Sequence, residues 1–289
     1  MLLPLLRLAR PRQWVKNAFV AAPLFFSPWA VNAASVGAVA IAIAVFCLLS
    51  STVYVINDLF DREADRLHPE KRDRPLASGA VTPGAAVVFA LVLLALAAAL
   101  ATLLPPRFIA DALAYFGINL FYSAGLKRIA ILDVLLVAAG FVLRVDAGAV
   151  TIGVAPSVWI MLATGLLALF LALAKRRDDL VRTLGAGHRA SLSGYNLRFV
   201  DTSLAVVLGA LLVCYLIYTA DAETVRRFGT DRLWLTAPFV IAGVMRYLQV
   251  TLVEERSGSP TDVVLTDRFL ILTVLGWVAT FALLIYGPR

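Results

Sequence analysis

The chain contains nine apolar runs, each long enough to cross a lipid bilayer. They cover approximately residues 15–33, 37–57, 84–104, 108–124, 130–150, 157–175, 201–220, 233–251 and 269–287. A transmembrane helix needs about 20 apolar residues, and these runs are too long and too uniform for barrel strands. Because lipid cannot satisfy backbone polar groups, each run is expected to be helical. The sequence therefore predicts an all-α polytopic membrane protein with nine transmembrane helices.

Composition predicts a single membrane domain that spans residues 1–289. The chain is 61% hydrophobic and only 16% charged, and its mean hydropathy is +0.86. Soluble domains are nearer half apolar and about a quarter charged. Both cysteines, Cys47 and Cys214, lie inside apolar runs, which excludes a disulfide framework and a cysteine metal site. Arginine and proline interrupt the first apolar stretch, so no cleavable signal peptide is expected.

The basic residues predict the orientation of the chain. The net charge is +7, and most of the 26 lysines and arginines fall in segments on the same side as the N-terminus. Cytoplasmic loops carry such an excess, so the N-terminus is predicted in the cytoplasm and the protein in the inner membrane. The charge suits anionic lipid or phosphorylated substrates, and a nucleic-acid partner is not expected. The oligomeric state stays open, and a homo-oligomer is allowed.

An acidic motif closes the second apolar run. Asn57, Asp61 and Asp65 are spaced at i, i+4 and i+8, so on a helix they share one face, with Asp58 beside them. One or two carboxylates, completed by substrate phosphates and water, suit Mg²⁺. We therefore predict Asn57, Asp61 and Asp65 as ligands of a Mg²⁺-bound diphosphate, with Asp61 and Asp65 catalytic. The alternative is a helix end with solvated charges.

Basic residues lie close to the predicted metal site in sequence. The chain has only four lysines, each in or beside an inner segment: Lys16, Lys71, Lys127 and Lys175. Compact ammonium groups kept at such positions favour phosphate contacts. Lys71, Arg74 and Lys127 are expected to neutralise a leaving diphosphate, whereas Lys16 and Asn17 are expected to reach a lipid phosphate. Membrane anchoring is the alternative for the basic residues at the ends of the apolar runs.

Asp133 and Arg144 lie within the run 130–150, where an ionisable residue needs a partner. Asp133 follows Lys127 by less than two turns, and Arg144 lies in the middle of the run. Arg144 is expected to face the interior of the helix bundle. It either pairs with Asp146 or Asp133, or binds a substrate anion.

These motifs resemble the UbiA superfamily of intramembrane prenyltransferases. The resemblance rests on Asn57-Asp58-x-x-Asp61-x-x-x-Asp65, Arg74-Pro75-x-x-x-Gly79 and Tyr122-x-x-x-x-Lys127, and it covers the whole chain. It implies a UbiA-type helical bundle. Aromatic prenyltransferases of this superfamily carry a second Asp-x-x-x-Asp element after the sixth span. Here Lys175-Arg176-Arg177-Asp178-Asp179 stands at that place, with lysine for the first aspartate, which suits a substrate with more phosphate.

Further motifs resemble one branch, the decaprenyl-phosphate phosphoribosyltransferases. They are Arg10-Pro11-Arg12-Gln13-Trp14-x-Lys16-Asn17, His68-Pro69-x-Lys71, Leu126-Lys127 and Asp262…Asp267-Arg268. The branch implies transfer of 5-phosphoribose from phosphoribosyl pyrophosphate to a polyprenyl phosphate, which feeds cell-wall arabinan. The resemblance implies catalytic Asp61, Asp65, Lys127 and Asp133, the last orienting Lys127 or the ribose hydroxyls. It implies substrate-binding Lys16, Asn17, Asp58, Lys71, Arg74, Tyr122, Arg144, Lys175, Arg176 and Asp179.

Two other functions fit parts of the pattern. The first is transfer of a prenyl group from a prenyl diphosphate to an aromatic or quinone precursor, against which Lys175 argues. The second is a lipid transporter or flippase, which would show charges on both faces and broken helices near the midplane. The acidic and basic motifs on one side of the predicted membrane speak against it.

Overall fold

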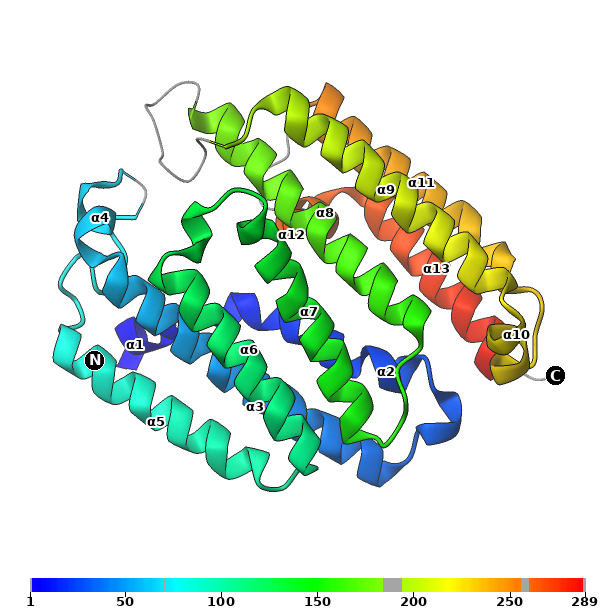
Figure 1. Ribbon diagram of the computed structural model, residues 1–289, viewed down its shortest axis with the longest axis horizontal. Helices are drawn as coiled ribbons and strands as arrows, with labels where there is room; N and C mark the ends of the chain where they lie inside the picture. The colour runs from blue at the N-terminus through cyan, green and yellow to red at the C-terminus, as the bar shows by residue number, and fades with distance from the viewer. Residues whose placement is uncertain (1, 70, 184–193, 256–259, 288–289) are drawn as a thin grey trace. The chain divides into compact units, whose positions relative to one another are not determined.

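The computed structural model describes residues 2–69, 71–183, 194–255 and 260–287, with the backbone alone at 2, 182–183 and 260–262. Every regular element in these residues is a helix (Figure 1), which confirms the all-α prediction. The side chain of Asp262 lies outside the described residues. The chain divides into two units by its internal contacts. Unit 1 comprises Met1–Lys127 and Ala139–Pro156, and unit 2 comprises Arg128–Ala138 and Ser157–Arg289.

Unit 1 is built around one long helix, α3 (Ala33–Phe60), which packs against α1, η1, α5 and α6. The buried side chain of Phe46 on α3 lies edge-on to Phe108 of α6, and Val20 belongs to the same apolar cluster. The other elements are α1 (Leu2–Ala9), η1 (Pro11–Ala21), α2 (Ala22–Phe25), η2 (Pro28–Ala30), α4 (Arg62–Leu67), α5 (Pro83–Ala101), α6 (Pro106–Ala124), most of the single turn η3 (Leu126–Arg128) and the later part of α7 (Leu132–Thr151).

Local sequence fixes where the long helices of unit 1 begin. Asn32 precedes α3 in an extended conformation, and its side-chain oxygen accepts a hydrogen bond from the backbone N–H of Ser35 at 2.9 Å. Thr82 caps α5 in the same way, and Pro83 follows as the first helical residue. Such caps satisfy backbone donors that have no partner within the helix, and proline at the first position loses no hydrogen bond.

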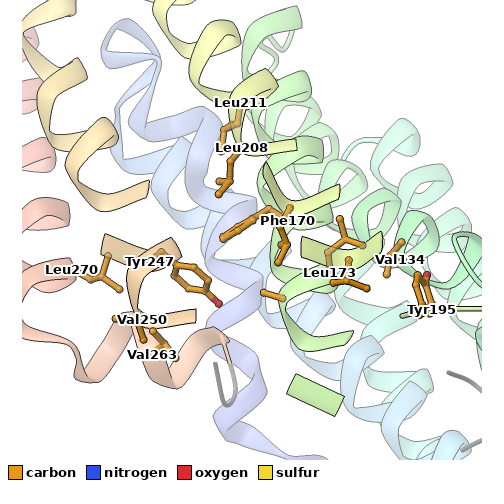
Figure 2. Packing of buried hydrophobic residues seen from close by; sticks show 13 residues of the cluster. Val134, Phe170, Leu173, Tyr195, Leu208, Leu211, Tyr247, Val250, Val263 and Leu270 are labelled. Carbon is orange, nitrogen blue, oxygen red and sulfur yellow. The ribbon is translucent and has the colours of Figure 1, made fainter. Parts of the chain in front are cut away.

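Unit 2 consists of helices around an apolar core (Figure 2). Its elements are the first part of α7, α8 (Val158–Thr183), α9 (Leu197–Ala220), α10 (Ala222–Phe228), η5 (Leu233–Thr236), α11 (Ala237–Leu248), the π-helical turn η6 (Gln249–Val253), α12 (Pro260–Thr266) and α13 (Arg268–Tyr286). Helix α8 packs against α9, and α11 packs against α13. Figure 2 shows Phe170 of α8 and Tyr247 of α11 in this core, with their rings 4.8 Å apart.

Seven helices of the described chain are long and apolar enough to cross a membrane. They cover Ala33–Phe60, Pro83–Ala101, Leu132–Thr151, Val158–Val181, Leu197–Ala220, Leu233–Val253 and Arg268–Tyr286. This fits a multi-pass membrane protein. The predicted count of nine spans is not confirmed.

The two remaining predicted spans, residues 15–33 and 108–124, are not among these seven helices, and the sequence gives a physical reason for each. The run 15–33 was predicted wrongly as one span, because it forms the short elements η1, α2 and η2. Prolines at 23 and 28 lack the backbone N–H that a continuous helix needs. The run 108–124 does form a helix, α6, but this helix is not among the seven. It carries Arg107, Asp111 and Asn119, which lower its mean hydropathy.

Candidate active site

The acidic motif lies where α3 passes into α4. The backbone N–H of Asp61 donates to the carbonyl oxygen of Asn57 at 2.9 Å, and that of Asp65 donates to Asp61 at 2.8 Å. Helical spacing therefore continues from Asn57 to Asp65, although α3 ends at Phe60. This i, i+4, i+8 arrangement is the one that the sequence predicts.

The side-chain oxygens of Asn57 and Asp61 converge on one cation. The Nζ of Lys127 donates to both carboxylate oxygens of Asp61 at 2.7 Å and to Oδ1 of Asn57 at 3.1 Å. Lys127 lies in η3, just after α6. Tyr122, another predicted site residue, lies half-buried in the last turn of α6.

A second carboxylate pair is held by Arg74. Its Nη1 lies 3.1 Å from Oδ1 of Asp58 and 2.6 Å from Oδ2 of Asp65. Lys71 approaches Asp65 at 3.8 Å, and Arg10 also donates to Asp58. Both carboxylates are almost fully buried, with residue exposures of 2% for Asp58 and 3% for Asp65. Charge-assisted hydrogen bonds of this kind are the strong ones in proteins.

The acidic motif therefore forms two pairs, whereas the sequence predicts one ligand set. Asn57 and Asp61 share Lys127, and Asp58 and Asp65 share Arg74. Within the described residues no three His, Cys, Asp or Glu side chains lie close enough together to hold a metal ion. The Lys127 ammonium nonetheless occupies a position at which the side-chain oxygens of Asn57 and Asp61 both contact a positive charge. This donor set fits Mg²⁺, which takes one or two carboxylates and completes its shell with water and substrate phosphate.

A buried arginine lies elsewhere in unit 1. Arg144 is 6% exposed and donates from Nε to Oδ1 of Asn17 at 2.8 Å, from Nη1 to the Gly140 carbonyl at 2.9 Å and from Nη2 to the Tyr115 hydroxyl at 2.8 Å. All three acceptors are uncharged. The pair with Asp146 that the sequence allowed does not form, since Asp146 pairs with Arg107 at 3.5 Å.

Lys16 and Asn17 come from η1, the segment that packs against α3. The Asn17 amide donates to Sγ of Cys47 at 3.2 Å and to Oγ of Ser50 at 3.4 Å, both on α3. Burial, with repulsion from Arg144 and then Arg10, lowers the pKa of Lys16 to about 8. Lys16 lies outside the seven helices that could span a membrane.

One glycine sets the distance between η1 and α7. A Cβ added at Gly148 would lie 2.0 Å from the backbone oxygen of Val20, so only glycine permits this approach. Gly148 is one turn after Arg144, and Val20 is close to Asn17 in sequence, which links this contact to the Asn17–Arg144 hydrogen bond.

Gly148→Ala is expected to destabilise unit 1 by roughly 3 kcal/mol, at the upper end of overpacking costs, because the obstacle is backbone. Thermal unfolding of the purified protein in detergent measures the loss. Gly117→Ala on α6 is the matched control, since a Cβ at Gly117 meets nothing within 4 Å. Equal unfolding temperatures for the two variants would contradict the close approach.

The predicted site residues of unit 2 lie around Asp133. Its carboxylate is fully buried and accepts from Nε of Arg176 and from the Tyr195 hydroxyl, both at 2.6 Å. Arg176 also donates to Asp179 at 3.0 Å, and Lys175 is exposed on the same helix, α8. Burial, and next the hydrogen bond to Asp133, raises the pKa of Tyr195 to about 12.

Tyr195→Phe is expected to destabilise unit 2 by about 1–3 kcal/mol, because it leaves the Ile131 N–H and one bond to Asp133 unsatisfied. Thermal unfolding again measures the effect. Tyr218→Phe serves as the control, because the described residues give its hydroxyl no hydrogen bond. If Tyr195→Phe is as stable as the control, the Tyr195 hydroxyl has no structural role.

Sequence reasoning missed the neutral residues that hold the charged ones. Tyr115 and Ser50 lie inside apolar helices and belong to no recognised motif. Tyr195 lies just before α9, and nothing in its sequence spacing indicates the bond to Asp133. The rule that polar groups within a membrane need partners is the signal that applies to Tyr115 and Ser50.

Comparison with known proteins identifies the family. The model of the UbiA prenyltransferase family matches residues 14–200, well over half of the chain. The chain belongs to the UbiA prenyltransferase family. Among curated UbiA relatives, the decaprenyl-phosphate phosphoribosyltransferase of Mycolicibacterium smegmatis is 36% identical, with 98% of this chain and 92% of the relative covered. The enzyme of the same name from Corynebacterium glutamicum is 35% identical over 98% of this chain and 86% of the relative.

Solved structures give the same fold. A UbiA homolog from Archaeoglobus fulgidus bound to DMAPP and Mg²⁺ matches with a TM-score of 0.73 at 21% identity, covering 98% of this chain and 99% of that one. This likeness shows a UbiA fold, and in that homolog the fold binds a divalent metal. With the curated relatives, it makes this UbiA member a membrane transferase similar to the decaprenyl-phosphate phosphoribosyltransferases, which sets the transporter hypothesis aside.

Proposed function

We propose that the protein transfers 5-phosphoribose from phosphoribosyl pyrophosphate to a polyprenyl phosphate of the decaprenyl type. The product would be a polyprenylphosphoryl-5-phosphoribose, a precursor of cell-wall arabinan. The observation that carries the proposal is the pairing of an acidic motif with cations, in a chain about 36% identical over 98% of its length to an enzyme of that name.

The paired charges support a diphosphate as the leaving group. Lys127 and Arg74 are held by carboxylates rather than by neutral groups, and Lys71 lies beside Asp65. Cations placed in this way can exchange a carboxylate for phosphate oxygens without moving far. They then neutralise the negative charge that develops on the departing pyrophosphate.

In this proposal Asn57 and Asp61 hold Mg²⁺, with Asp65 close by in the same motif. Bound Mg²⁺ polarises the diphosphate oxygens and so makes the diphosphate a better leaving group. The chain's own residues do the remaining work. Asp61 gives up its hydrogen bonds to Lys127, and the freed ammonium of Lys127 donates to phosphate oxygens together with Arg74.

The bond from ribose C1 to the diphosphate oxygen breaks, and a bond from C1 to an oxygen of the lipid phosphate forms. C1 gains oxocarbenium character as pyrophosphate leaves. The attacking phosphate is already ionised, so the reaction needs no strong general base. This fits a site in which every carboxylate of the acidic motif is engaged with a cation or an amide neighbour.

In unit 2 we assign substrate phosphate contacts to Lys175 and Arg176, with Asp179 and Asp133 positioning Arg176. We further propose the orientation that the basic residues indicate, with the N-terminus and the acidic motif facing the cytoplasm and the protein in the inner membrane.

A side-by-side donor assay tests the function. Purified protein in lipid nanodiscs is offered labelled phosphoribosyl pyrophosphate with polyprenyl phosphates of several lengths, and separately a labelled prenyl diphosphate with an aromatic acceptor. Each mixture is run with Mg²⁺ and with chelator. Metal-dependent label in lipid from the first donor alone is expected. Consumption of the prenyl diphosphate instead would establish the rival prenyltransferase activity.

A further inference from the structure

The guanidinium of Arg144 is buried without a negative partner. Among the described residues its acceptors are an amide, a backbone carbonyl and a phenol, each at 2.8 or 2.9 Å. Three aromatic rings surround it, with its Cζ 4.5 Å from the ring centre of Tyr115, 5.2 Å from that of Phe141 and 5.8 Å from that of Phe46. These contacts orient the cation and leave its charge uncompensated, which is costly inside a membrane protein.

Three partly buried cations of unit 1 differ in this respect. Arg74 has Asp58 and Asp65, Lys127 has Asp61, and Arg10 has Asp58. The missing counter-charge at Arg144 is therefore a property of that position. It is not the general condition of basic residues in this unit.

A second cation lies within electrostatic range of Arg144. Lys16 is half-buried and pairs with no carboxylate in the part of the chain that the structure describes. Burial, with further repulsion from Arg144 and then Arg10, lowers the pKa of its ammonium to about 8. Two neighbouring cations that lack an anion form a region of positive potential in a low-dielectric setting, where an anionic group is strongly favoured.

The hydrogen-bonding capacity of Arg144 indicates the shape of the missing anion. A guanidinium has five N–H donors, and three of these are used, one on each nitrogen. One N–H on Nη1 and one on Nη2 remain. Two donors on the two terminal nitrogens match the paired oxygens of a phosphate or carboxylate.

We infer that Arg144 and Lys16 form a second anion subsite in unit 1, distinct from the acidic motif, which takes a phosphate monoester dianion. Two positive charges match the double charge of such a group near neutral pH. Asn17 is a positioning residue, since it holds Nε of Arg144 and is itself fixed by Cys47 and Ser50. The inference rests on the proposed function, which supplies two monoesters: the head group of the polyprenyl phosphate and the 5-phosphate of the ribose.

Direct binding separates these two sources and does not require turnover. Equilibrium binding of farnesyl monophosphate and of ribose 5-phosphate is measured on the full-length protein in nanodiscs, without phosphoribosyl pyrophosphate. Arg144→Gln is expected to weaken binding of one probe by about tenfold or more, the equivalent of one lost charge-assisted contact, and to leave the other within twofold. The probe that is lost identifies the source of the phosphate.

Two further variants control for misfolding of Arg144→Gln and for a general loss of positive charge. Lys16→Gln, at a side chain with no hydrogen bond or ion pair in the described structure, is expected to fold and to weaken the same probe by about fivefold or more. It therefore decides the matter if Arg144→Gln does not fold. Arg107→Gln, at an exposed arginine of the same unit, is the matched control and should bind both probes as the wild type does.

The results can be told apart from failure of the proposed function. A wild-type protein that binds a monophosphate probe through Arg144 and Lys16 but transfers no phosphoribose keeps the subsite and loses the function. A wild-type protein that transfers phosphoribose, while Arg144→Gln and Lys16→Gln both bind both probes unchanged, keeps the function and overturns the subsite. Weak binding to wild type and variants alike also overturns it.

Discussion

Asp61→Asn should lower phosphoribosyl transfer by roughly 100-fold to 1,000-fold or more, the range seen when one charge-stabilising group is removed from a transition state. The substitution keeps the size of the side chain and removes the charge that meets Lys127 at 2.7 Å. An amide is a poorer partner both for Lys127 and for a divalent ion. The initial rate of lipid labelling, at saturating concentrations of both substrates, measures the loss.

A matched variant separates this effect from a general change in charge. Asp73 is an exposed aspartate in the same segment, and no ion pair of the described residues involves it. Asp73→Asn is expected to retain wild-type turnover. Circular dichroism and size-exclusion profiles should be unchanged for both variants, because Asp61 is partly exposed and its loss empties no apolar space. Wild-type turnover by Asp61→Asn would rule out Asp61 as a ligand of the catalytic Mg²⁺.

Arg74→Gln is expected to destabilise unit 1 strongly. Arg74 bridges two carboxylates that are almost fully buried, so its removal leaves Asp58 and Asp65 close together with less compensation. Breaking a buried ion pair from one side costs roughly 3–5 kcal/mol. Arg10 still pairs with Asp58, and Lys71 still lies near Asp65, which places the expected loss toward the lower end of that range.

Thermal unfolding of the purified protein in detergent measures this loss. Arg72→Gln, at an exposed arginine in the same segment, is the matched control and should unfold at the wild-type temperature. Equal unfolding temperatures for Arg74→Gln and Arg72→Gln would contradict the bridging role of Arg74.

The sequence predicted the helical class and the residues of the acidic motif well, because both follow from local patterns. Apolar run length identifies helices in lipid, and i, i+4 spacing survives the break between α3 and α4. The prediction for residues 15–33 was wrong, since it followed hydropathy and neglected two prolines that prevent a continuous helix. A pattern of apolar residues does not by itself show which positions lack a backbone N–H donor.

The division of the acidic motif into two pairs was beyond the sequence for a different reason. Helical spacing tells which side chains share a face, but it does not tell which cation meets each one. Arg74, which meets Asp58 and Asp65, follows shortly after the motif in the chain. Lys127 lies 66 residues from Asp61, and Arg144 lies 127 residues from Asn17. Tertiary packing decides such contacts, and one sequence alone holds no record of it.

The central claim is that the protein breaks the bond between ribose C1 and the diphosphate and joins C1 to a lipid phosphate. Label position tests it directly, using phosphoribosyl pyrophosphate carrying ³²P either in the 5-phosphate or in the β-phosphate, with polyprenyl phosphate as acceptor. The account predicts that the 5-phosphate label enters the lipid fraction, that the β-phosphate label leaves as pyrophosphate, and that chelator abolishes both. β-Phosphate label in the lipid fraction, or no lipid label from phosphoribosyl pyrophosphate labelled at either position, would contradict this reaction.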